Sequence, residues 1–226
     1  MAVRAEEYNF TLLENSFLQV GPASRFTVLG TLNREKILDL KLLSESNSIN
    51  SLTRALGLTG FSGQFDANIY IRGDLINPDL EAYLWVPRFT YGNWRIDTLI
   101  METNIDHLIQ QRTGSARLSA NRIQSNYLEF TETRADLIFQ GRQILLDTLL
   151  FAKGENRLST SGVFNFESDT LQFRFDFFRI FYENYWIENS GPLLFSYNTR
   201  DFYIDRAVFS APDSGEIELR GFYEQS

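Results

Sequence analysis

The sequence predicts an all-β protein with one short helix, built on an elongated, mostly antiparallel sheet that either curves around an open groove or closes into a sandwich. Three observations carry this prediction. A strand-turn-strand unit recurs, strand-length stretches alternate apolar and polar residues, and short turns rich in Gly, Pro, Asn and Ser separate them. Short connections favour antiparallel neighbours, because parallel pairs need long crossovers. A closed β-sandwich is the alternative fold that the same alternation allows.

The recurring unit has two apolar strands joined by a short polar turn and ends on a glycine at the start of another apolar strand. Its copies run over residues 10–32, 144–164 and 202–223. Each copy carries an acidic residue and then the glycine at a near-constant distance: Glu14 and Gly30, Asp147 and Gly162, Asp205 and Gly221. Such acids are typical of turns and strand edges. A repeated hairpin builds an extended sheet, which usually acts through a long continuous surface.

After the first copy, residues 48–56 have helical spacing. Asn47 or Ser48 is a suitable N-cap and Gly57 a suitable stop. The apolar residues of this helix are Ile49, Leu52 and Leu56. We expect a lid packed on the end or open edge of the sheet, with a gate over a groove as the alternative role. The glycine-containing stretch 57–63 is a candidate joint between two β blocks, but no linker divides the chain, so we treat 1–226 as a single domain.

The stretches that follow alternate most regularly, and each is predicted to form a strand with one apolar face and one polar, solvent-facing side. Residues 64–72 place Phe65, Ala67, Ile69 and Ile71 on one face, and residues 80–86 place Leu80, Ala82, Leu84 and Val86 on one face. Later, Leu171, Phe173, Phe175 and Phe177 alternate with Gln172, Arg174 and Asp176, and Ile217 and Leu219 alternate with Glu216, Glu218 and Arg220. We expect about fourteen such strands in all.

The composition excludes several classes of partner and site. Net charge is −8 with a pI near 4.8, and no Lys or Arg cluster is present, which argues against nucleic acid as a partner. Twenty Phe, ten Tyr and three Trp imply that a large apolar surface has to be covered. With no cysteine, disulfides and thiolate metal sites are excluded. The first ten residues lack the apolar core of a signal peptide and no run is long enough for a membrane helix, so any targeting segment is expected on a longer parent chain.

Catalytic patterns are missing. The one histidine, His107, follows Asp106 and is expected at the surface, and no phosphate-binding glycine loop, nucleophile elbow or His-Glu zinc pattern occurs. The acidic pairs Glu216 with Glu218 and Asp74 with Asp79 fit solvated charges on a strand and at a turn. We therefore expect no enzyme activity, no metal and no cofactor.

Residues 58–86 resemble a recurrent passage of the TamB and AsmA-like envelope proteins. The matching order is a glycine turn, an alternating strand, a Gly-Asp-Leu turn, an Asn-Pro pair and a second strand, carried by Gly63, Gly73, Asp74, Leu75, Asn77, Pro78 and Leu80. The three hairpin copies also resemble the strand pairs of that family. Gly73 relieves strain at a corner, and Pro78 sets a turn and has no amide donor.

This resemblance implies a function. Family members are long, carry an N-terminal membrane helix and form a β half-pipe whose apolar interior carries phospholipid from the inner to the outer membrane. Some act with the outer-membrane partner TamA in protein assembly. The present chain is short and lacks the anchor, so we expect a section of such a duct, in the periplasm of a Gram-negative-type bacterium, on a parent chain anchored in the inner membrane. Expected partners are phospholipid acyl chains, a TamA-like barrel and the rest of the parent chain.

The predicted mechanism is passive, with acyl chains lying along an apolar groove and headgroups left in water. The residues predicted to line this groove are Phe65, Ile69, Ile71, Leu84, Val86, Leu137, Phe139, Phe173, Phe175, Phe177, Ile217 and Leu219. Two further classes remain. A closed sandwich could bind a glycan or protein through exposed aromatics, namely Tyr83, Trp85, Trp94, Tyr185 and Trp186. An outer-membrane barrel also alternates, but the strands here are short and broken by charges.

Overall fold

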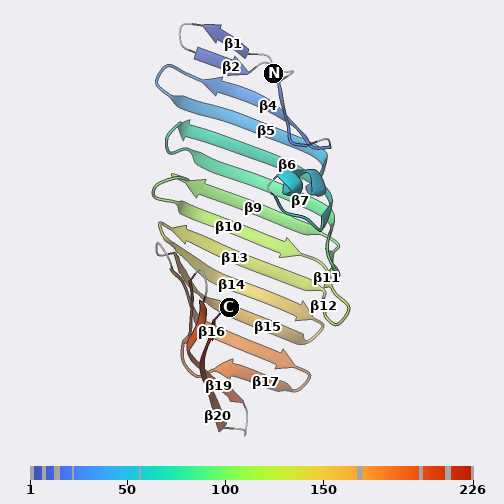
Figure 1. Cartoon of the computed structure of the whole chain (residues 1–226), viewed down its shortest axis with the longest axis vertical. Coiled ribbons are helices and arrows are strands. Elements are labelled where there is room, and N and C mark those ends of the chain that lie inside the picture. The colour runs from blue at the N-terminus through green and yellow to red at the C-terminus, as the bar shows by residue number, and fades with distance from the viewer. Residues whose placement is uncertain are drawn as a thin grey trace.

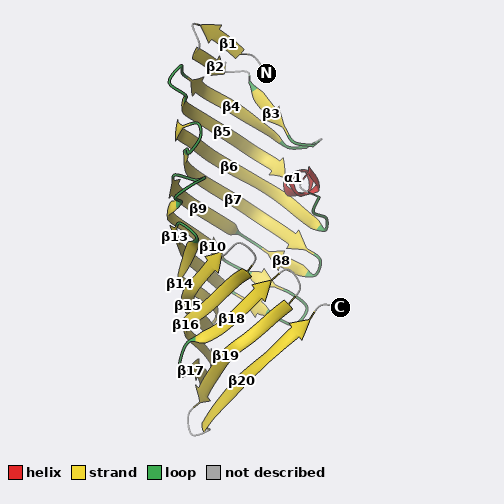
Figure 2. Ribbon diagram, turned by 60° about the vertical axis from the view of Figure 1, so that its left-hand side comes forward, coloured by secondary structure: helices red, strands yellow, loops and turns green. Residues whose placement is uncertain are grey.

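The computed structural model describes residues 3–6, 9–12, 16–21, 23–55, 57–166, 170–198, 201–211 and 215–224. These residues form a single sheet of twenty strands and one short helix (Figure 1). Every strand pairing among them is antiparallel. The sheet is elongated and curved, which confirms the predicted fold class (Figure 2).

The strands run in chain order from one end of the sheet to the other. The long strands are β4 (Arg25–Leu32), β5 (Ile37–Ser48), β6 (Phe61–Asp74), β7 (Asp79–Tyr91), β9 (Leu99–Asp106), β10 (Thr113–Ala120), β13 (Glu132–Gln140), β14 (Gln143–Lys153), β15 (Asn156–Phe166), β16 (Thr170–Tyr182), β18 (Leu193–Asn198), β19 (Asp201–Ala211) and β20 (Gly215–Glu224). Shorter strands are β1 (Val3–Glu6), β2 (Asn9–Leu12), β3 (Phe17–Gln19), β8 (Trp94–Ile96), β11 (Ile123–Gln124), β12 (Glu129–Phe130) and β17 (Tyr185–Asn189).

The two ends of the sheet do not meet. Among the described strands, β1 pairs with β2 alone and β20 pairs with β19 alone. The fold is therefore an open curved sheet and not the closed sandwich that alternation also allowed. The stretch 57–63 does not separate two sheets, because β6 begins within it and pairs with both β5 and β7.

Closely approaching glycines and β-bulges curve the sheet. A Cβ atom added to Gly30, Gly63, Gly114 or Gly162 would lie 1.9, 2.3, 2.0 or 2.1 Å from a carbonyl oxygen of the neighbouring strand. Only glycine allows the two backbones to come so close, and such glycines together with bulges are the usual means of bending a sheet.

The repeated acid and glycine seen in the sequence belong to these bends. Asp147 lies in a bulge of β14 beside Leu146, the partner of Gly162, and Asp205 lies in a bulge of β19 beside Ile204, the partner of Gly221. The expectation that these acids occupy turns or strand edges is wrong for both, since each lies within a strand. Glu14 lies outside the described residues. In these two copies, the repeated acid and glycine therefore mark a bulge in one strand opposite a glycine in the next.

The predicted helix is present as α1 (Ile49–Ala55). Ser48 is its N-cap, with the side-chain Oγ accepting a hydrogen bond from the Ser51 amide at 3.4 Å. Gly57, at φ +77°, donates its amide to the Arg54 carbonyl at 3.0 Å, and the Leu58 amide reaches the Thr53 carbonyl at 2.8 Å. This is a Schellman ending, which requires the left-handed glycine. Leu56, the last predicted apolar residue of the helix, lies outside the described residues.

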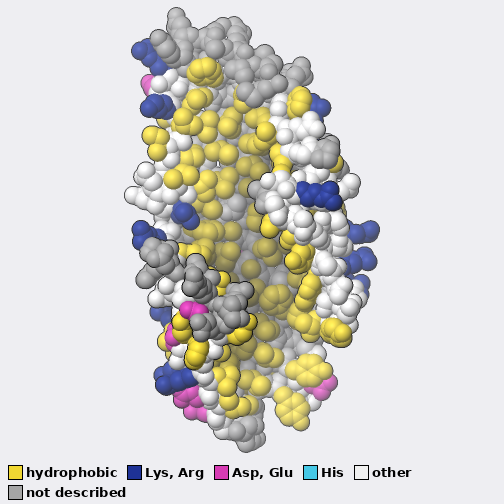
Figure 3. All heavy atoms as spheres, viewed as in Figure 1, with side chains coloured by type: hydrophobic (Ala, Val, Ile, Leu, Met, Phe, Trp, Pro, Cys, Tyr) yellow, Lys and Arg dark blue, Asp and Glu magenta, His cyan; other side chains and the backbone are white. Residues whose placement is uncertain are grey.

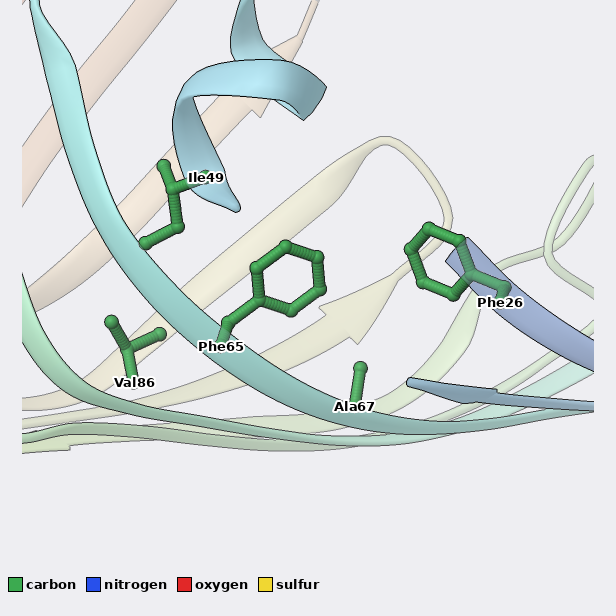
Figure 4. Close-up of a cluster of buried hydrophobic side chains, with 5 residues drawn as sticks. All are labelled: Phe26, Ile49, Phe65, Ala67 and Val86. Atoms are coloured by element: carbon green, nitrogen blue, oxygen red, sulfur yellow. The ribbon is translucent and has the colours of Figure 1, made fainter. Parts of the chain in front are cut away.

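Helix α1 packs on one face of the sheet over β6 and β7 (Figure 1). Figure 4 shows Ile49 of the helix above Phe65 and Val86, with Phe26 and Ala67 beside them. The Phe26 and Phe65 rings lie 6.0 Å apart. The helix therefore covers a local apolar core on a face of the sheet, and not the end or open edge where we expected it. Asn47, at the start of the helix, is buried and bonds both the amide and the carbonyl of Arg25 at 2.8 Å.

Candidate functional site

The face of the sheet that carries α1 is hollowed and apolar. We call it the trough. Figure 3, in the same view as Figure 1, shows hydrophobic side chains gathered along the visible length of this hollow. Because residues directly opposite each other on antiparallel strands share a face, the strand register extends the assignment from Phe65 and Ala67 to the remaining strands.

Three rows of directly opposite residues cross the trough. The first is Leu12, Gly30, Leu40, Ile71, Leu80, Ile105, Gly114, Phe139, Ile144, Phe164, Phe173, Phe195, Ile204 and Gly221. The second is Val28, Leu42, Ile69, Ala82, Thr103, Ala116, Leu137, Leu146, Gly162, Phe175 and Leu193. The third is Phe26, Ser44, Ala67, Leu84, Met101, Leu118, Ala135, Leu149, Thr160 and Phe178.

None of these three rows contains a charged residue. Their only polar side chains are the hydroxyl groups of Ser44, Thr103 and Thr160. The large apolar residues of the rows are half-buried or buried, and together they form an apolar surface that continues from strand to strand. Extended apolar surfaces of this kind mark interaction sites.

Phenyl rings fill the trough towards the C-terminal end of the sheet. The ring of Phe164 lies 5.2 Å from that of Phe173 and 6.0 Å from that of Phe175, both edge-on. Phe195 continues the contact, 5.8 Å from Phe175 and 6.0 Å from Phe202. These edge-to-face and stacked pairs hold the rings in place and present them as one connected apolar wall.

The opposite, outer face carries the charges. Arg117 and Asp136 form an ion pair at 2.8 Å, and Arg174 and Asp176 form another at 2.9 Å. Cation–π contacts lie there too, with Arg179 5.7 Å from the centre of the Trp186 ring. The two faces are therefore chemically distinct, as the alternation predicted.

The structure places all of the predicted groove residues on the trough except Phe177. A bulge at Asp176 shifts the register of β16, so Phe175 faces Gly162 and Phe177 faces Ser161. Phe177 lies on the outer face, where the Arg179 guanidinium is 5.6 Å from its ring centre. The prediction that Phe177 continues the alternation of Phe173 and Phe175 is wrong for this reason.

Several trough residues were not predicted as groove residues. Phe164, Leu193, Phe195 and Phe202 belong to it. Phe178 also does, and the adjacent pair Phe177 and Phe178 was a signal for the bulge, because two neighbouring large apolar residues interrupt strict alternation.

The outer face has a shallow polar hollow of about 660 Å³. The residues that line it include Tyr70, Tyr83, Glu102, Arg117 and Asp136. The hydrogen bond from Arg134 to Asp136, and then that from Arg117, hold the pKa of the Asp136 carboxyl below its usual value. A carboxylate kept ionised in this way is unsuited to donating a proton near neutral pH.

The remaining candidate residues are ordinary surface groups. His107 is exposed at a turn, where its amide bonds Asp79 at 2.9 Å, and the Asp74 carboxylate accepts the Ile76 amide at 2.7 Å. The described residues contain no group of three or more His, Cys, Asp or Glu placed to hold a metal ion. Across the same ranges, no helix has the length and apolar character needed to cross a membrane.

Comparison with known proteins adds no relative: no family model, no curated protein and no solved structure matches the chain.

Proposed function

We propose that the trough binds phospholipid acyl chains and that the chain is a section of a TamB-like, periplasmic lipid-transport protein. The observation that supports this most is the continuity of the three trough rows, which pass from strand to strand without a charged residue. An extended acyl chain can lie along a continuous apolar surface of this kind, and an open trough leaves the headgroup in water.

The energetics fit passive transport. Each methylene moved from water onto an apolar surface contributes about 0.8 kcal/mol, so an acyl chain is held without any specific polar contact. Neighbouring positions along the rows are chemically alike, so an acyl chain that slides from one position to the next exchanges one apolar contact for another. A charge in the trough would interrupt this movement, because it would lose water whenever an acyl chain covered it.

The cellular setting comes from the resemblance of residues 58–86 and of the hairpin repeat to the TamB and AsmA-like proteins. It places the chain in the periplasm of a Gram-negative-type bacterium, moving lipid from the inner to the outer membrane. A parent chain anchored in the inner membrane and a TamA-like barrel are the partners that follow, with a role in outer-membrane assembly.

The experiment is lipid extraction from protein purified without detergent, followed by mass spectrometry. The Phe175→Arg variant places a charge in the second trough row, among the phenyl rings towards its C-terminal end, and we expect it to lose co-purified phospholipid. Phe177→Arg is the matched control, because it introduces the same charge two residues away on the outer face. We expect it to retain lipid.

Circular dichroism of both variants is the control that tests whether they fold. Equal lipid in folded Phe175→Arg and in the original protein would refute the proposal. Equal loss in the two variants would refute it as well, since the effect would not depend on the face.

A second candidate function is glycan binding on the outer face. Tyr83, 39% exposed, lines the polar hollow together with acidic and basic groups, and Trp85 beside it is 37% exposed. Flat aromatic rings next to hydrogen-bonding groups suit a sugar. Tyr83→Ala should abolish such binding in a glycan-array assay and leave lipid content unchanged.

A further inference from the structure

Among the described residues, β20 is the last strand of the sheet and has an apolar surface and an edge without a partner strand. Its trough residues Ile217 and Leu219 are 63% and 48% exposed. The strand spans Gly215–Glu224 without proline or lysine, the residues that commonly protect an edge from pairing. Such an edge is a site for the addition of another strand.

Gly221 indicates that a neighbour belongs beside β20. In the two other copies of the repeat, Gly30 and Gly162 are crowded by a carbonyl oxygen of the following strand, which lies 1.9 and 2.1 Å from the place that a Cβ atom would take. At Gly221 a Cβ would meet nothing within 4 Å. The repeat thus supplies a glycine for a close neighbour that the described residues do not provide.

We propose that two copies of this chain pair through β20, antiparallel, with Leu219 opposite Leu219 of the second copy. In this register, Glu218 of each copy lies opposite Arg220 of the other copy. Ile217 of each copy lies opposite Gly221 of the other, where the absence of a side chain leaves room for it. Moving the centre of symmetry by one residue sets either Glu218 opposite Glu218 or Arg220 opposite Arg220. Like charges directly opposite each other destabilise a strand pair, and the Leu219-centred register avoids every such pair.

The pairing continues the trough. Directly opposite residues share a face, so Ile217 and Leu219 of each copy meet on the trough side, while Glu218 and Arg220 meet on the outer side. Two troughs then run into one through the paired edges. This contact is closed by two-fold symmetry and leaves no second copy of the same edge free. It does not depend on what fills the trough.

The first test is sedimentation velocity over a concentration series. We expect a reversible dimer in the original protein. Glu218→Arg should weaken it at least about tenfold, because two opposite-charge pairs become two like-charge pairs. Adding Arg220→Glu to that variant should restore the dimer. Glu81→Arg, an equal charge change on the outer face away from the edge, should leave it unchanged.

The second test uses the absence of cysteine from the chain. Leu219→Cys should give a disulfide-linked dimer on mild oxidation, because directly opposite Cα atoms lie about 4.5–5.5 Å apart, within disulfide range. Ile138→Cys, exposed on the outer face and away from the paired edge, should give no disulfide-linked dimer. A protein that stays monomeric at all concentrations, or a dimer unaffected by Glu218→Arg, would overturn the proposal.

Discussion

Gly162 lies directly opposite Phe175 across β15 and β16, and a Cβ at Gly162 would come 2.1 Å from the Arg174 carbonyl oxygen. The bulge at Asp176 follows at once. One place in the sheet therefore brings two strands unusually close, bends them and turns the next side chain, Phe177, to the outer face. At this place the close approach at Gly162 and the adjoining bulge accompany both the bend of the sheet and the absence of Phe177 from the trough.

Gly162→Ala should destabilise the protein by about 2–3 kcal/mol, because the added methyl group overlaps backbone that cannot rotate away. Urea unfolding followed by circular dichroism measures the change in the free energy of unfolding. The matched control is Gly221→Ala, at the same place in its repeat but with no atom within 4 Å of the new methyl group. Measured at low protein concentration, it should change stability by less than about 0.5 kcal/mol. Equal effects in both would show that close approach does not matter.

The strands that sequence predicts best are those without a bulge on the relevant side. Alternation places Phe65, Ile69 and Ile71 correctly because the extra residues of the two bulges beside Phe65 lie in β5 and β7 and not in β6. It fails at Phe177, since a bulge adds one residue and reverses every face beyond it. The apolar-polar alternation also does not determine whether the sheet stays open and curved or closes into a sandwich. Curvature comes from backbone approach at a few glycines, and the sequence shows the glycines without the strand that crowds them.

Asn47→Ala should cost about 2–4 kcal/mol of stability. The buried Asn47 side chain bonds both backbone groups of Arg25 at 2.8 Å, and its removal leaves that amide and carbonyl without these partners. Because Asn47 also precedes α1, amide hydrogen exchange in the helix should accelerate. Asn104→Ala, exposed on the outer face, is the control and should change stability by less than about 0.5 kcal/mol. An Asn47 variant as stable as this control would contradict the assignment.

Asp136 should make the protein less stable in acid. Its folded pKa is lowered, mainly by the hydrogen bond from Arg134, so its stabilisation is present above the unfolded pKa of about 3.9 and is lost as pH falls through the folded pKa. The side chain is 15% exposed but both arginines are about half exposed, which limits the contribution to about 1 kcal/mol. Asp136→Asn should be less stable than the original protein at pH 7, and the difference should shrink below about pH 4. A difference independent of pH would rule out a charge effect.

Leu137 and Ile138 offer the sharpest test of which face meets an acyl chain. They are neighbours on β13, yet Leu137 lies opposite Ala116 in the second trough row and Ile138 lies opposite Ser115 on the outer face. Because the chain has no cysteine, a single Leu137→Cys or Ile138→Cys substitution can carry an environment-sensitive fluorophore at one chosen position. When delipidated protein is mixed with phospholipid vesicles, an acyl chain that enters the trough should displace water from the Leu137 probe and shift its emission to shorter wavelength. The Ile138 probe should keep its spectrum, since the sheet separates it from the trough by one backbone layer. Equal shifts at both positions would indicate that the protein adsorbs to the vesicle surface instead of taking up lipid along the trough.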